Sequence, residues 1–240
     1  MKHVSIEAFY CADASWKVLN AIWFQGEHFN VGNGSEEGDT KKLDVSIHIS
    51  HPENLPLVGD FSPTDMKHIQ EYGLTYLYSD FLGGHPYTYG WRLQHPVDQK
   101  EELIKAIIKN PNNRQLTMTI RIPEDAYPTR LDEDNKVVKH EPPCLTMMDF
   151  EVLNGKVNLT CYFRSWDAYA GLPENIAGIF LYLQAFVSDV NERLPEDKQL
   201  KTGEMMFYSK NCHIYKRCYP LVEQLMMSKK TNRYIENHKI

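Results

Sequence analysis

The clearest structural signal in the chain lies at residues 147–163, which read MMDFEVLNGKVNLTCYF. Two runs in which apolar and polar residues alternate, Met147–Leu153 and Lys156–Phe163, flank the dipeptide Asn154-Gly155. A two-residue hairpin of type I′ needs a positive φ at both central residues, and Asn-Gly adopts it readily. The stretch therefore predicts a β-hairpin with one side of each strand facing a core.

Helices and further strands are predicted on both sides of this hairpin. Apolar residues at helical spacing predict helices over 13–25, 64–78, 97–110, 175–194 and from residue 220 onward. Alternation predicts further strands at 43–49, 116–122 and 205–208. The charged segment 125–141 is expected to be an exposed loop. The sum is an α+β fold with a mixed or antiparallel sheet, and no linker divides residues 1–240, so a single domain is expected.

Composition excludes several classes of protein. The chain has 240 residues, 42% of them apolar and 24% charged, as in ordinary globular proteins. Its net charge of −6 argues against DNA or an anionic membrane as a partner. No apolar run approaches the roughly 20 residues that span a bilayer, and no signal peptide is recognised. The five scattered cysteines predict neither disulfides nor a zinc site, so a cytoplasmic location is expected.

Two motifs around the hairpin could carry chemistry. In Pro142-Pro143-Cys144 the prolines stiffen the backbone before a thiol, which a nearby cation could activate as a nucleophile. Such a cysteine is as readily a core residue at the start of a strand. Arg164 and Ser165 follow the hairpin directly, and a guanidinium beside a hydroxyl suits a phosphate. The alternative is an ion pair between Arg164 and Asp167.

Three further motifs could bind a ligand. Asn175 lies where Gly171–Asn175 opens the apolar helix, and its amide offers the donor and acceptor that a pyrimidine edge requires. Plain capping of the helix explains it equally well. His213 and Tyr215 share one face of an extended segment, where they could hold a sugar or pack as an aromatic pair. Arg114, between a helix and a strand, is another candidate phosphate ligand or a solvated side chain.

The order and spacing of these motifs resemble those of the thymidylate synthase family. The resemblance is strongest over residues 110–215 and can be traced over 16–92. The motif Phe163-Arg164-Ser165 and the short segment Tyr87–Gly90 are similar to those of the shorter, archaeal-type branch of the family. The resemblance implies a mixed sheet packed with a long central helix, and a homodimer formed through the sheet face.

In this family a cysteine thiolate adds to ring carbon 6 of a uridine nucleotide, and carbon 5 then attacks the one-carbon unit of methylenetetrahydrofolate. The resemblance implies that dUMP becomes dTMP and that dihydrofolate is released, with no metal. It implies that Glu71 relays protons through water to the pyrimidine carbonyl. It also implies that Tyr89 is the tyrosine of the active site.

The resemblance assigns the nucleophile and the phosphate ligands. Cys144 is implied to be the nucleophile, because a thiolate both attacks well and leaves again. Arg164 and Ser165 would hold the nucleotide phosphate, and Arg164 would lower the pKa of the thiol. Arg114 would reach the same phosphate from the second subunit of the homodimer. Lys41, or the lysine after it, loosely matches a cation in a flexible loop of the family.

The resemblance also assigns base, sugar and folate recognition. Asn175 matches the position that reads the pyrimidine edge, where the family has Asn with uracil and Asp with cytosine. His213 and Tyr215 match the pair that binds the sugar hydroxyl, which dUMP and UMP share. Asp167 matches the position that holds the pterin of the reduced folate.

Several positions depart from the family pattern. Leu145 stands in place of a histidine, Phe163 in place of a glutamine and Gln115 in place of a second phosphate-binding arginine. Residues 80–89 lack the tryptophan that shields the methylene intermediate from water, and the C-terminal segment that closes over folate is short. Water at that intermediate gives a hydroxymethyl product. Three interpretations stay open: a thymidylate synthase, a hydroxymethylase of dUMP, dCMP or UMP on the same fold, and a nucleotide- or RNA-binding protein without catalysis.

Overall fold

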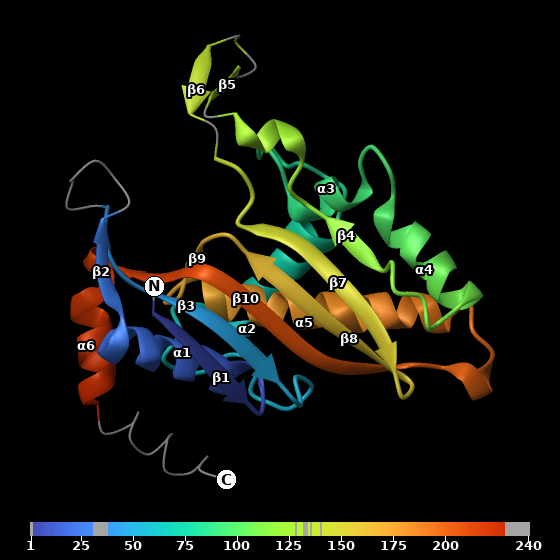
Figure 1. The fold of residues 1–240 in the computed structure, drawn as a ribbon, viewed down its shortest axis with the longest axis horizontal. Helices are drawn as coiled ribbons and strands as arrows, with labels where there is room; N and C mark the ends of the chain where they lie inside the picture. The colour runs from blue at the N-terminus through green and yellow to red at the C-terminus, as the bar shows by residue number, and fades with distance from the viewer. Residues whose placement is uncertain are drawn as a thin grey trace.

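The computed structural model of the chain describes residues 2–30, 38–127, 129–131, 134, 136–139 and 141–228. Its centre is an eight-stranded sheet with the order β1-β3-β10-β8-β7-β4, in which β2 also pairs with β3 and β9 with β10 (Figure 1). The strands are β1 His3–Ala8, β2 Glu27–Asn30, β3 Asp39–Ile49, β4 Thr117–Thr119, β7 Leu145–Leu153, β8 Lys156–Phe163, β9 Trp166–Asp167 and β10 Lys201–Tyr215.

The sheet is mixed, which agrees with the prediction of an α+β fold with a mixed or antiparallel sheet. β10 runs antiparallel to β3 and parallel to β8 and β9, while β1 runs parallel to β3. β7 pairs antiparallel with β8 and β4. The predicted hairpin is confirmed: its turn has φ of 52° at Asn154 and 74° at Gly155, as a type I′ turn needs.

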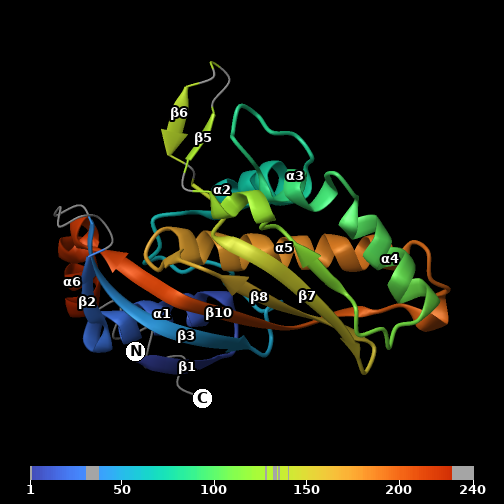
Figure 2. The ribbon, with the colours of Figure 1, turned by 45° about the horizontal axis from the view of Figure 1, so that its top comes forward.

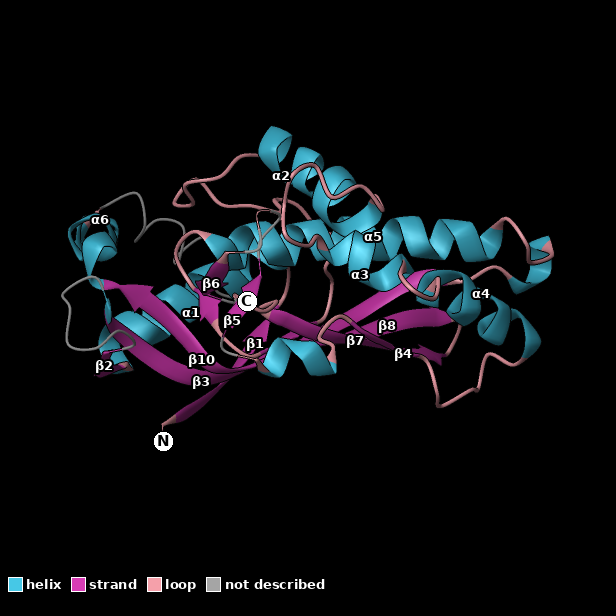
Figure 3. Ribbon diagram, turned by 90° about the horizontal axis from the view of Figure 1, so that it is seen from above, coloured by secondary structure: helices cyan, strands magenta, loops and turns pink. Residues whose placement is uncertain are grey.

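The helices lie along the sheet, and the longest crosses it. They are α1 Cys11–Gln25, α2 Met66–Tyr72, α3 Tyr89–Gln94, α4 Gln99–Lys109, α5 Gly171–Asn191 and α6 Tyr219–Met227, with a π-helix at Gly73–Tyr78. In Figure 2, α5 runs across the strands behind β7 and β8. Figure 3 shows α2 and α5 on the same side of β3, β7, β8 and β10. This side of the sheet therefore holds the core.

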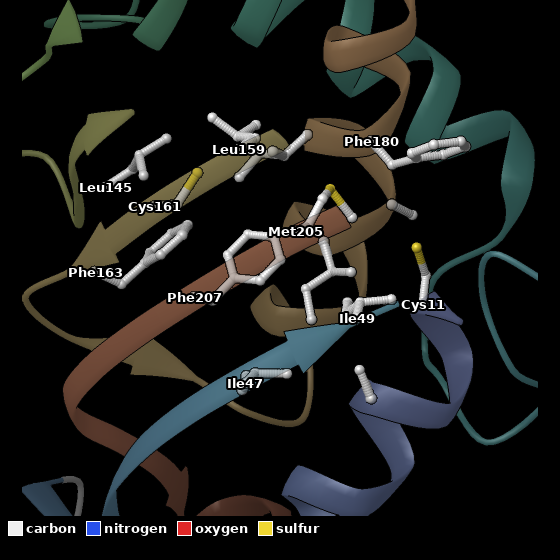
Figure 4. Close-up of a cluster of buried hydrophobic side chains, with 14 of the residues drawn as sticks. Cys11, Ile47, Ile49, Leu145, Leu159, Cys161, Phe163, Phe180, Met205 and Phe207 are labelled. Atoms are coloured by element: carbon white, nitrogen blue, oxygen red, sulfur yellow. The ribbon is translucent and has the colours of Figure 1, made fainter. Parts of the chain in front are cut away.

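The core lies between the sheet and the helices α1 and α5. Figure 4 shows Ile47 and Ile49 of β3 and Phe207 of β10 pointing toward Phe180 of α5 and Cys11 of α1. All five side chains are at most 2% exposed. Burial of apolar surface stabilises a fold by roughly 25 cal/mol per Å², so this layer is the main source of stability.

The opposite face of the sheet is polar and partly exposed. His48 of β3 is 2.7 Å from a carboxylate oxygen of Glu7 on β1 and 2.6 Å from one of Glu204 on β10. Burial works to lower the pKa of His48, but the two carboxylates prevail and raise it. Three neighbouring strands are thus tied together on the side away from the helices.

Most predicted helices and strands form, with shifted ends. α1 begins at Cys11, two residues before the predicted start at Asp13. The Asp13 carboxylate accepts hydrogen bonds from the Phe9 backbone N–H at 2.9 Å and from Lys17 at 2.8 Å. The predicted helix over 64–78 becomes α2, which changes to a π-helix at Gly73.

Three predictions were wrong or incomplete. Within the segment predicted as an irregular loop, 125–141, β5 Thr129–Leu131 pairs with β6 Val137–Lys139. The strand predicted at 205–208 is part of β10, which runs from Lys201 to Tyr215 because both of its edges pair with other strands. β1 was not predicted, since its six residues carry only a short alternation.

Two helical glycines give a matched test of the packing between α2 and α5. At Gly178 of α5 an added Cβ would lie 2.8 Å from the Tyr72 ring, so Gly178→Ala must push the helices apart. We expect a loss of about 1–3 kcal/mol in the free energy of unfolding. At Gly73, with φ −58° and ψ −44°, an added Cβ meets no atom within 4 Å. Gly73→Ala should therefore stabilise the protein by about 0.5–1 kcal/mol.

Urea unfolding followed by circular dichroism measures both variants against the parent protein. Equal effects of the two alanines would show that the contact between Gly178 and Tyr72 does not constrain the helix pair.

Candidate functional site

Cys144 lies just before β7, at the point where the two prolines lead into the strand, and it is half-buried. Arg164, just after β8, holds this point in place. Its Nε donates to the Pro143 carbonyl at 2.9 Å and its Nη2 to the Pro142 carbonyl at 2.6 Å. The backbone N–H of Arg164 donates to the Cys144 carbonyl at 2.9 Å. Two of the five guanidinium N–H groups are used, which leaves three for a ligand.

Burial and charge act in opposite directions on the Cys144 thiol. Burial raises its pKa, the Arg164 guanidinium lowers it and Glu141 raises it again, so that the pKa stays above the usual value. Three other cysteines, Cys11, Cys161 and Cys212, are fully buried. The structure thus pairs a partly accessible thiol with a cation, although burial outweighs the cation.

Four tyrosines form an aromatic cluster beside the thiol. The ring of Tyr76 lies 5.6 Å from that of Tyr72 and 5.0 Å from that of Tyr89, and the rings of Tyr87 and Tyr89 are 6.2 Å apart. The Tyr89 hydroxyl accepts from the Leu145 backbone N–H at 3.4 Å. Burial raises the pKa of all four hydroxyls, so they are neutral donors and acceptors.

Only Tyr89 of this tyrosine cluster was singled out from the sequence. The negative charge of a Cys144 thiolate would act on Tyr76, Tyr87 and Tyr89, and the hydroxyl of Tyr89 bonds the backbone of the residue after Cys144. Two spacings in the sequence indicate the cluster. Tyr72 and Tyr76 are about one helical turn apart, and Tyr87 and Tyr89 are separated by a single residue.

Asn175, at the start of the second turn of α5, connects this cluster to Trp166 of β9. Its Oδ1 accepts from the Trp166 indole N–H at 2.8 Å, and its Nδ2 donates to the Tyr72 hydroxyl at 2.8 Å. The indole ring stacks on Phe163, with ring centroids 3.9 Å apart and planes 1° from parallel. The amide keeps one N–H and one oxygen lone pair for a ligand.

His213 and Asp167 are brought together because β9 pairs with β10. The His213 Nδ1 lies 3.2 Å from the Asn211 carbonyl, so in the neutral ring Nδ1 carries the proton. Burial lowers the pKa of His213 and favours that neutral ring. Its Nε2 is buried without a partner among the described residues, and its lone pair can accept from a hydroxyl. Tyr215 meets the imidazole edge-on at 4.6 Å.

Asp167 turns the chain into α5. Its Oδ1 accepts from the backbone N–H groups of Tyr169 at 3.0 Å and Ala170 at 3.3 Å. The other carboxylate oxygen is left to accept from a ligand. Ser165, between Arg164 and Trp166, is half-buried at the end of β8.

Two predicted cations do not join Cys144 in this chain. The Lys41 ammonium donates to the Trp23 carbonyl at 3.2 Å and lies 4.3 Å above the Trp23 ring. Arg114 is exposed in the connection before β4, where it lines a hollow with Glu151. Seven strand residues separate Cys144 from Glu151, about 23 Å at 3.3 Å per residue, which is beyond the reach of an arginine.

Two charged residues near these side chains, Arg217 and Glu174, were not predicted from the sequence. The Arg217 guanidinium lies 4.1 Å above the Tyr215 ring. Glu174, beside Asn175, is 2.7 Å from the His68 Nε2, and burial raises its pKa against the effect of His68. Glu71 is exposed on α2, so Glu174 is a second candidate for a proton-relaying carboxylate. Glu174 could have been predicted from the sequence, because it lies within the Gly171–Asn175 motif.

Two kinds of feature are absent from the part of the chain that the structure describes. Within it, no group of three or more His, Cys, Asp or Glu side chains could hold a metal ion. None of the helices in these ranges is both long and apolar enough to cross a membrane.

Known proteins resemble this chain over most of its length. A family model described as thymidylate synthase matches residues 63–236. Proteins named "Putative thymidylate synthase" from Methanosarcina acetivorans and Methanosarcina mazei are each 27% identical over 224 residues, covering 92% of this chain and 94% of theirs. A protein of the same name from Methanococcoides burtonii is 26% identical with the same coverage. The similarity thus reaches archaeal proteins over nearly the whole chain.

The opposing effects of burial and of Arg164 on the pKa of Cys144 can be tested by alkylation of the thiol. Arg164→Gln removes the charge that lowers the pKa of Cys144, so that pKa should rise further. Because the thiolate reacts, each unit of rise slows alkylation about tenfold at a pH below the pKa. The rate of iodoacetamide addition to the Cys144 peptide, followed by mass spectrometry across pH 7–10, measures the shift.

Arg193→Gln is the control, because Arg193 is exposed and paired with Glu101 at 2.8 Å. An unchanged profile for Arg164→Gln would mean that Arg164 does not act on the thiol.

Proposed function

The chain belongs to the thymidylate synthase family, and we propose from this that it methylates ring carbon 5 of dUMP with methylenetetrahydrofolate to give dTMP and dihydrofolate. The observation that supports the proposal is a braced thiol beside an arginine, accompanied by the amide of Asn175 and the buried imidazole acceptor of His213. They come from the starts or ends of β7, β8, α5 and β10. Together they would provide a nucleophile and contacts for phosphate, base and sugar.

The nucleotide would be held at three places. The three remaining N–H groups of Arg164 would bind the phosphate, with Ser165 beside them. The His213 Nε2 would accept the hydrogen of a sugar hydroxyl, with Tyr215 as its neighbour. The free N–H of Asn175 would donate to the uracil O4 and its free lone pair would accept from N3–H.

Cys144 would carry the covalent step. Its thiolate forms a bond to carbon 6, and the electron pair of the carbon 5–carbon 6 double bond moves toward the O4 carbonyl. Carbon 5 is then nucleophilic and forms the bond to the one-carbon unit. Loss of the carbon 5 proton would break the bond between the one-carbon unit and the folate nitrogen, a hydride from the reduced folate would complete the methyl group, and departure of the Cys144 thiolate would restore the carbon 5–carbon 6 double bond. Arg164 supports the thiolate form against the effect of burial.

The chain's residues fit a reduced folate. Asp167 has a carboxylate oxygen that is not used by the turn into α5, and a pterin offers N–H groups to such an acceptor. When bound, methylenetetrahydrofolate supplies both the carbon and the hydride. The rings of Tyr76 and Tyr87 belong to the aromatic cluster near the thiol, and we propose that they limit the access of water in place of the family's tryptophan. This supports a methyl product over a hydroxymethyl product.

We also propose that the active protein is a homodimer, in which residues 1–240 form one catalytic domain of each subunit. Support comes from Arg114, which is too far from its own Cys144 to bind the same nucleotide. The polar sheet face around His48 and Tyr208 offers the surface for a second copy. Each subunit would then lend its Arg114 to the partner's phosphate site.

The reaction is tested by incubating the protein with dUMP and methylenetetrahydrofolate and analysing the products by mass spectrometry. We expect a gain of one methyl group on the nucleotide and release of dihydrofolate. Cys144→Ala should abolish turnover, because no other described residue replaces the thiolate, while dUMP still binds. Cys218→Ala is the matched control, since Cys218 is also partly exposed.

Turnover by Cys144→Ala would refute the covalent step. A hydroxymethyl nucleotide with tetrahydrofolate would replace the proposal by the hydroxymethylase. Tight binding of dUMP without any product would favour a binding protein.

The shared site is tested by mixing two inactive variants. Arg114→Ala impairs the phosphate site of the partner, and Cys144→Ala removes the nucleophile of its own subunit. After subunit exchange, half of the dimers are mixed and each contains one intact site. Activity should recover to about a quarter of the parental value. Recovery to no more than the sum of the unmixed variants would show that Arg114 serves its own subunit or no site.

A further inference from the structure

We propose that Trp166 locks the amide of Asn175 in one orientation and thereby makes the nucleotide site select uracil over cytosine. Trp166 is a positioning residue here, since it acts on the base through Asn175. The inference rests on the proposed function, because that function places the base at Asn175.

The lock begins with a tryptophan that is fixed in place. Trp166 is 2% exposed, and its ring lies between Phe163, at 3.9 Å, and Phe207, at 5.5 Å. Its indole N–H points to the Asn175 Oδ1 at 2.8 Å. A buried N–H without a partner is costly, and a packed ring cannot turn to find another one.

An asparagine amide can usually exchange its oxygen and nitrogen by rotating half a turn about its last side-chain bond. The two partners of Asn175 respond differently to that rotation. The Tyr72 hydroxyl accepts from Nδ2, and after a rotation it could donate to Oδ1 instead, because a hydroxyl does both. The Trp166 N–H only donates, so the rotated amide would set two donors against each other. Of the two partners that the described residues supply, Trp166 is therefore the one that holds the orientation.

The orientation decides which base fits. Uracil presents an acceptor, O4, beside a donor, N3–H, whereas cytosine presents a donor, the 4-amino group, beside an acceptor, N3. The locked Asn175 has one N–H and one lone pair left, in the arrangement that complements uracil. Cytosine would require the rotated amide, which loses the bond to Trp166. A free asparagine would accept both bases with little preference.

Equilibrium binding of dUMP and dCMP tests the lock without any folate. Isothermal titration calorimetry at neutral pH gives the two dissociation constants for the parent protein, which should bind dUMP more tightly. Trp166→Phe keeps a stacked ring but removes the N–H, so the preference for dUMP should fall about tenfold. The change should appear mainly as tighter binding of dCMP.

Tyr72→Phe is the matched control, because it removes the other hydrogen bond of the same amide. It should weaken dUMP and dCMP alike and leave their ratio unchanged. If Trp166→Phe does not fold, the tryptophan can be replaced by 3-benzothienylalanine, which has sulfur in place of the N–H and nearly the same shape. A purely structural role for Trp166 would lower both affinities together.

An unchanged ratio in the variant without the N–H would overturn the inference, as would an equal loss of preference in Tyr72→Phe. These outcomes leave the proposed function standing so long as the parent protein binds dUMP. A parent protein that binds neither nucleotide would overturn the proposed function, and the inference with it.

Discussion

Helix α5 is apolar around most of its circumference, and the need to bury it governs the whole molecule. The sheet covers one side of the helix, where the ring centroids of Phe186 and of Phe150 on β7 are 4.6 Å apart. On the other side α2 approaches so closely that only a glycine fits at position 178, against the Tyr72 ring. That approach brings the Tyr72 hydroxyl to Asn175. The packing that buries the helix thus also positions the Asn175 amide near the N-terminal end of α5.

Arg164 serves three purposes that a change at this position would alter together. It holds the carbonyl groups of Pro142 and Pro143, so the backbone at the thiol is fixed from the end of another strand. Its charge opposes the effect of burial on the pKa of Cys144. In the proposed function its remaining N–H groups would bind the nucleotide phosphate. A lysine could supply the charge but not the fork of donors, which separates Arg164 from a simple counter-ion.

Local signals in the sequence were sufficient for some parts of the structure. The Asn154-Gly155 hairpin was predicted because a turn of this type is decided by its own two residues. The motif residues Cys144, Arg164 and Asn175 were recognised by their order along the chain. The extent of β10 depends on its pairing with β3, which is more than a hundred residues away, and no local pattern contains it. Tyr72 and Asn175 are 103 positions apart, so their bond, and with it the setting of the amide, could only come from the structure.

The place of β10 also has a consequence for how the chain reaches its native state. This strand lies in the middle of the sheet, between β3 and β8, yet it is formed by residues 201–215. During synthesis the first and second halves of the sheet therefore emerge as separate pieces, each with an unpaired apolar edge. They can join only after residues 201–215 have left the ribosome. Such late, long-range pairing makes folding slow and leaves the nascent chain dependent on protection from aggregation.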